Sequence, residues 1–130
     1  MEKGYSVEIV GASRDFTVRE KLAIKELGNA VGIDTALLDE TDSLLIAPAD
    51  YAVLEIHNDK AKGQKDYKKY VVFDTNGTKY VTGSESFFRN FIDIYETMKV
   101  EAPDEDYQIE CYKRPSKNYT GKNFISCSMV

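Results

Sequence analysis

The stretch YVVFDTNGTKYVT, residues 70–82, is the part of the sequence that decides the fold. Runs rich in β-branched and aromatic residues flank Asn76-Gly77, a dipeptide preferred in two-residue hairpin turns. Such a turn predicts that Phe73 lies opposite Tyr80, which is a favourable cross-strand aromatic pair. The stretch therefore predicts a β-hairpin.

The same register divides the side chains of the hairpin between two faces. It pairs Asp74 with Lys79, which are opposite charges, and it places Phe73 and Tyr80 on one face. The other face carries Tyr70, Val72, Lys79 and Val81. Alternation alone leaves open which face is the core. We expect Phe73 to pack inside, with Tyr70 and Lys79 pointing outward.

A helix and two further strands are predicted after the hairpin. Ser84 is a candidate N-cap, and Glu85 suits the positive start of a helix. Large apolar side chains then recur at three- and four-residue spacing, which predicts core packing. These side chains are Phe87, Phe88, Phe91, Ile92, Tyr95 and Met98. Strands are expected at 107–112 and 123–129.

Before the hairpin, the pattern predicts further strands and one more helix. Two apolar runs within 44–57 fit one interrupted strand or two short ones, and residues 5–10 alternate as a half-buried strand does. Thr17 and Glu20 have the spacing of a capping box. The apolar face of that helix is expected to comprise Val18, Leu22, Ala23 and Leu27, with Gly28 as its stop. Residues 29–43 are interpreted as a loop that could hold a short strand.

From residue 51 onward the predicted order is three strands, a helix and two strands. This is the element order of an OB-fold, a five-stranded barrel with a helix between its third and fourth strands. We therefore expect a mainly β protein with two helices. The chain, residues 1–130, is expected to form one domain, in which residues 51–130 make the barrel and the strand and helix of residues 1–45 pack on it.

The charge is distributed unevenly along the chain. The formal net charge is −5, which by itself argues against a nucleic-acid partner. Segment 57–70, however, carries a net +3 and segment 113–122 a net +4, which leaves −12 on the remainder. Two basic segments in an acidic protein indicate a local anion-binding surface, although lysines also serve simply to keep loops soluble.

The predicted topology places both basic segments at functional positions. They fall in the connections between the first and second and between the fourth and fifth barrel strands, where OB-folds bind oligonucleotides together with the face of strands two and three. Cations there would contact phosphates, and aromatic rings would stack on bases. The candidate nucleic-acid-binding residues are Lys60, Lys62, Lys65, Lys68, Lys69, Tyr70, Lys79, Tyr80, Lys113, Arg114, Lys117, Tyr119 and Lys122.

Two segments, 79–87 (KYVTGSESF) and 114–122 (RPSKNYTGK), resemble small single-stranded DNA-binding proteins of phages and mobile elements in Gram-positive bacteria. The resemblance implies an OB-fold, support of DNA replication or recombination without sequence specificity, and no catalysis. It also implies single-stranded DNA as the partner, with replication or recombination proteins and a homodimer as further possibilities. Many such proteins end in an acidic tail, whereas this chain ends Ser126-Cys127-Ser128-Met129-Val130.

No catalytic or metal site is expected. His57 is the one histidine and has no Ser or Cys motif around it, so a structural role is the better interpretation. Cys111 and Cys127 fall on different predicted strands without a C-x-x-C motif, which favours buried free thiols over zinc. The acidic cluster at 39–42 matches no calcium loop. We therefore expect neither a cofactor nor enzymatic activity.

The composition favours a cytoplasmic protein that does not enter a membrane. No stretch approaches the about 20 apolar residues that span a bilayer, and the start of the chain lacks the pattern of a secretion signal.

The acidic remainder also supports a second hypothesis, a phage-encoded inhibitor or adaptor whose acidic surface binds a host protein by imitating phosphate charge.

Overall fold

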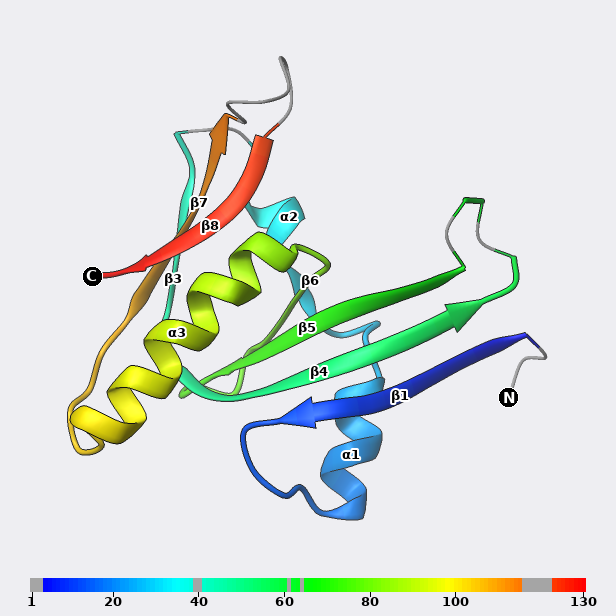
Figure 1. The fold of residues 1–130 in the computed structure, drawn as a ribbon, viewed down its shortest axis with the longest axis horizontal. Helices are drawn as coiled ribbons and strands as arrows, with labels where there is room; N and C mark the ends of the chain where they lie inside the picture. The colour runs from blue at the N-terminus through cyan, green and yellow to red at the C-terminus, as the bar shows by residue number, and fades with distance from the viewer. Residues whose placement is uncertain (1–3, 39–40, 61, 64, 116–122) are drawn as a thin grey trace.

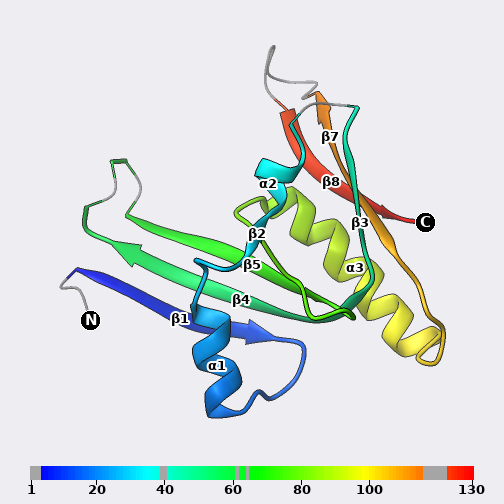
Figure 2. The same cartoon turned by 180° about the vertical axis from the view of Figure 1, so that it is seen from behind.

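The computed structural model describes residues 4–38, 41–60, 62–63, 65–115 and 123–130. These residues form eight strands in two sheets and three helices, so the expected mainly β class is confirmed (Figures 1 and 2). The strands are β1 (Tyr5–Ala12), β2 (Val31–Gly32), β3 (Ser43–Ile46), β4 (Pro48–Asn58), β5 (Asp66–Asp74), β6 (Lys79–Thr82), β7 (Ile109–Pro115) and β8 (Asn123–Met129). The helices are α1 (Val18–Lys25), α2 (Ile33–Ala36) and α3 (Glu85–Glu101). The short helix α2 was not expected.

The larger sheet has the order β1-β4-β5-β6-β2, and the smaller one has the order β3-β7-β8. Only Ala47 separates β3 from β4, so the chain passes almost without interruption from one sheet into the other. Among the described residues no ladder closes the two sheets into a barrel, and the expected OB-fold is therefore not confirmed. The N-terminal strand β1 pairs with β4 at the edge of the larger sheet.

The central hairpin is present, but its predicted register is wrong by one residue. Phe73 lies opposite Lys79, and Val72 lies opposite Tyr80. The turn contains three residues instead of two, because the Gly77 N–H donates to the Asp74 carbonyl over 2.9 Å and the Asp74 N–H donates to the Thr78 carbonyl.

Asp74 is the reason for the longer turn. Its Oδ1 accepts the Asn76 N–H at 2.9 Å, which is typical of an Asp that starts a turn. A two-residue type I′ turn needs positive φ at both central residues, but in the described part of the chain only glycines have positive φ. Gly77, at φ 91°, occupies the left-handed position that ends a three-residue turn.

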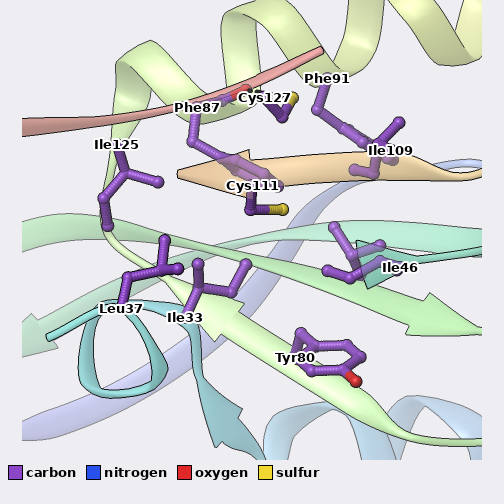
Figure 3. Packing of buried hydrophobic residues seen from close by; sticks show 11 residues of the cluster. Ile33, Leu37, Ile46, Tyr80, Phe87, Phe91, Ile109, Cys111, Ile125 and Cys127 are labelled. Carbon is purple, nitrogen blue, oxygen red and sulfur yellow. Dashed lines mark hydrogen bonds between the residues drawn. The ribbon is translucent and has the colours of Figure 1, made fainter. Parts of the chain in front are cut away.

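One face of the hairpin packs under α3 and the smaller sheet in the principal hydrophobic cluster. Figure 3 shows Phe87 and Phe91 pointing from α3 toward Cys111 and Ile109 of β7. All four side chains are fully buried, and Tyr80 of β6 belongs to the same cluster. The prediction that the aromatic stripe of this helix packs in the core is confirmed.

The opposite face of the hairpin packs under α1. Ile24 of α1 is buried with Val71, while Phe73 is partly buried at the edge of the same cluster. The capping box is confirmed, because the Thr17 hydroxyl accepts the Glu20 N–H and a Glu20 carboxylate oxygen accepts the Thr17 N–H. The helix ends at Lys25, before the predicted stop.

The predicted apolar face of α1 is wrong for Val18, Leu22 and Ala23, while Leu27 packs against the cluster of Ile24 after the helix has ended. Val18 and Leu22 are 74% and 64% exposed, whereas Ile24 faces the sheet. The reason is Lys79 of β6, whose ammonium group donates to the carbonyls of Ala23 (2.6 Å) and Glu26. The Ala23 carbonyl also accepts the Glu26 N–H, so the lysine adds a second donor at the C-terminal end of α1 and fixes how the helix is turned on the sheet.

We expect Lys79→Met to destabilise the protein. Methionine keeps most of the buried stem but removes the ammonium donor from the carbonyls of Ala23 and Glu26, of which Ala23 keeps only the Glu26 N–H, and this costs about 1–3 kcal/mol in free energy of unfolding. Urea denaturation followed by circular dichroism measures this loss. Lys99→Met, at an exposed position of α3, is the control and should stay within about 0.5 kcal/mol. Equal stability of the two variants would contradict the role assigned to Lys79.

Candidate nucleic-acid interface

The first basic segment is shared between a connection and a strand. The predicted loop 58–69 is shorter than expected, because β4 continues to Asn58 and β5 begins at Asp66. Lys60, Lys62 and Lys65 are exposed in the connection, whereas Lys68 and Lys69 lie on β5. Since neighbouring strand residues point to opposite faces, Lys68 and Lys69 cannot serve one surface together.

His57 holds the base of this connection. Its Nδ1 lies 2.6 Å from Oδ1 of Asp66, and its Nε2 lies 2.6 Å from Oδ1 of Asp59. The Asp59 N–H in turn donates to the Gly4 carbonyl. These carboxylates, Asp66 first, stabilise the imidazolium and raise the pKa of His57 above its ordinary value.

A hollow beside Lys68 does not suit a phosphate. Its lining includes the carboxylates Glu55, Asp66 and Glu85 around that single lysine. Glu55 lies directly across the ladder from Lys68, so part of the positive charge is already balanced. The exposed lysines of the connection are therefore the better cations of this segment.

The second basic segment begins on β7. Lys113 is half-buried opposite Ile125, whereas Arg114 is exposed opposite Phe124. Lys117, Tyr119 and Lys122 lie outside the described residues.

Three side chains form a platform on the outer face of β7 and β8, the face turned away from the buried Cys111 and Cys127. The Arg114 guanidinium carbon lies 4.7 Å from the ring centroid of Tyr112, and the Tyr112 hydroxyl accepts a hydrogen bond of 3.1 Å from Ser128. Phe124, 39% exposed, lies opposite Arg114. We name Tyr112, Arg114 and Phe124 the β7–β8 platform; a planar cation beside two aromatic rings is suited to stacking against bases.

Sequence reasoning missed Tyr112 and Phe124 because both lie inside predicted strands rather than in the basic loop. The sequence does contain a signal for Tyr112. It precedes Arg114 by two positions, and residues two apart on a strand share a face.

Three candidate residues do not reach the surface expected for them. Tyr70 is buried with its ring stacked on Phe88 at 4.4 Å, and Tyr80 lies in the principal cluster. Burial raises the pKa of both phenols. Lys79 is buried under α1, so the expectation that Tyr70 and Lys79 point outward is wrong. The cause is that both faces of the hairpin are covered, by α3 and by α1.

A chain of contacts nevertheless connects the two basic segments. The ammonium group of Lys69 lies beside Gly83, just before the start of α3. A Cβ atom added to this glycine would be 3.5 Å from Lys69 Nζ. The hydroxyls of Ser84 and Ser86 donate to the Ile125 carbonyl, and Ile125 pairs with Lys113. The N-terminal turn of α3 thus lies between β5 and the β7–β8 hairpin.

Other kinds of site find no support in the described residues. They contain no group of three or more His, Cys, Asp or Glu side chains placed to hold a metal ion. Cys111 and Cys127 lie opposite each other as buried free thiols, and burial raises the pKa of Cys127 to about 12. None of the described helices is long and apolar enough to cross a membrane.

The raised pKa of His57 predicts a pH-dependent contribution to stability. A folded-state pKa above the unfolded value makes this contribution complete below about pH 6.5, and it is lost as the pH rises through the folded-state pKa. Urea unfolding should therefore show a larger stability gap between wild type and His57→Gln at pH 5.5 than at pH 9. The single imidazole also allows an unambiguous NMR titration, and a midpoint at or below the ordinary pKa of histidine would contradict the contacts assigned to Asp59 and Asp66.

In comparisons with known proteins, no family model, curated protein or solved structure matches the chain.

Proposed function

We propose that this chain is a sequence-nonspecific single-stranded DNA-binding protein that has no catalytic activity and supports phage or mobile-element replication or recombination. The observation that carries the proposal is the β7–β8 platform, in which Arg114 lies over Tyr112 beside the exposed ring of Phe124. Stacking on aromatic rings contributes about 1–3 kcal/mol per base and is tolerant of sequence, because every base has a π-face.

Cations on both sides of the start of α3 supply the phosphate contacts in this proposal. Lys60, Lys62 and Lys65 are exposed at the tip of the β4–β5 hairpin, and Arg114 lies at the end of β7. Lys117 and Lys122 follow Arg114 in the sequence and are further candidates for these contacts. The single-stranded DNA would run from the β4–β5 tip past the N-terminal turn of α3 to the β7–β8 platform.

We further propose that the strands from β3 onward follow an OB topology. β3 and β4, taken as one bent strand, are followed by β5, β6, α3, β7 and β8, so a helix again separates the third and fourth strands. The bent strand pairs with β7 through its first half and with β5 through its second half. A strand shared by two sheets supports a partly open barrel of this type.

Titration with fluorescently labelled oligo(dT) at several salt concentrations tests the proposal. With three to five phosphates neutralised, the log–log slope of affinity against salt should be about −2 to −3.5. Phe124→Ala should weaken binding about 5- to 100-fold through lost stacking, and Lys62→Glu with Lys65→Glu should weaken it and make the slope shallower.

The matched control reverses the same number of charges elsewhere. Lys21→Glu with Lys25→Glu, on α1, changes the net charge equally but lies outside the proposed track, so oligo(dT) affinity should stay within about threefold. Absence of oligo(dT) binding at low salt, or equal loss in both double variants, would overturn the proposal.

A further inference from the structure

The outer edge of β1 is open. In the described part of the chain β1 pairs only with β4, so the backbone N–H and C=O groups on its other side have no strand partner. Figures 1 and 2 both show β1 as the last strand of its sheet, with α1 and the connection before it extending past that edge. In both views α1 runs crosswise to β1, so a strand added there would pass across α1.

A surface hollow occupies this position. It is lined by residues 8–12 of β1, by the connection around Arg14 and Phe16, and by Lys21 and Lys25 of α1. The exposed face of α1 continues it, because Val18 and Leu22 share the helix face of Lys21 and Lys25 at spacings of three and four residues. Backbone donors, lysines and apolar side chains are therefore adjacent.

The charge balance of the hollow favours an anionic occupant. Within the described residues Lys21 and Lys25 form no ion pair, whereas Arg14 is already held by Glu20 (2.8 Å) and Asp50 (3.3 Å). Of the two acids in the lining, Asp15 belongs to the connection.

The other acid, Glu8, points away from α1. Its neighbours Val7 and Ile9 pack on the α1 side, and side chains alternate along a strand. On the α1 side of the edge the two lysines outnumber Asp15, so the local charge there is positive.

We propose that the edge of β1 and the exposed face of α1 bind an extended acidic segment of another protein by β-strand addition. The segment pairs its backbone with β1 and directs carboxylates, at alternate positions, toward Lys21 and Lys25. Its remaining side chains are apolar or small. This inference is independent of DNA binding.

Two features disfavour a second copy of this chain as the occupant. The ladder with β4 shifts between Ile9 and Gly11, and such a bulge shortens the regular edge that symmetric pairing needs. A second β1 would also bring its own α1, so that Lys21 and Lys25 would meet their like-charged copies. A short foreign segment brings no second α1, and it can pair with the regular part of the edge on one side of the bulge.

Fluorescence anisotropy with an octapeptide of alternating Asp and Val tests the proposal. The peptide should bind wild type, and Lys21→Glu with Lys25→Glu should weaken binding at least about tenfold. Lys62→Glu with Lys65→Glu, the matched control, should change the affinity less than about twofold. An alternating Lys and Val peptide should not bind.

Two further measurements separate strand addition from simple charge attraction. A peptide with Pro in place of Val keeps the carboxylates but lacks those N–H groups, so it should bind at least about tenfold more weakly. In hydrogen exchange, the Asp and Val peptide should protect amides of β1. Equal binding of the Pro peptide, no binding at millimolar concentration, displacement of the peptide by oligo(dT), or a β1 edge occupied by a second copy in solution would each overturn the proposal.

Discussion

The structure depends on covering both faces of the β5–β6 hairpin. Val72 and Tyr80 on one face, and Val71 and Phe73 on the other, are all large and apolar, so neither face can remain in water without cost. One cover is α3 with the smaller sheet, and the other is α1. The second cover packs on the sheet through Ile24, and the buried ammonium group of Lys79 fixes its end through the carbonyls of Ala23 and Glu26. A lysine suits this position because its long side chain crosses the layer and its ammonium group carries enough donors for both carbonyls.

Local sequence patterns predicted the helices and strands well. Prediction from the sequence fails where a contact between distant segments determines how an element is oriented. The capping box at Thr17, the N-cap at Ser84 and the aromatic stripe of α3 all depend on neighbours within a few residues. The orientation of α1 depends on Lys79, more than fifty positions away. The spacing of apolar residues within α1 does not indicate this contact. Val18 and Leu22 have the spacing of a core face although both are exposed.

The hairpin register shows how one residue redistributes a candidate site. Asn76-Gly77 favours a two-residue turn, but Asp74 captures the Asn76 N–H and lengthens the turn by one. Because side chains alternate, this slip moves Lys79 onto the face of Phe73 and places Tyr80 with Val72. Tyr70 and Tyr80, the expected stacking residues of the hairpin, are therefore core residues. Tyr112 and Phe124, which flank segment 113–122, keep exposed surface instead.

Covering both hairpin faces also limits where any ligand can bind. A ligand that needs aromatic rings finds them on the β7–β8 platform, because Tyr70 and Tyr80 are enclosed. A ligand that needs backbone partners finds them at an edge strand such as β1 and not at β4 or β5, which have strands on both sides. The two surfaces lie on different sheets: the platform belongs to the smaller sheet, and the edge of β1, with Lys21 and Lys25 beside it, belongs to the larger one. A guanidinium over a ring is also present beside β1, where Arg14 lies 4.3 Å from the ring centroid of Phe16, but this guanidinium is already paired with Glu20 and Asp50. Nucleic acid and an acidic strand therefore need not compete for the same surface.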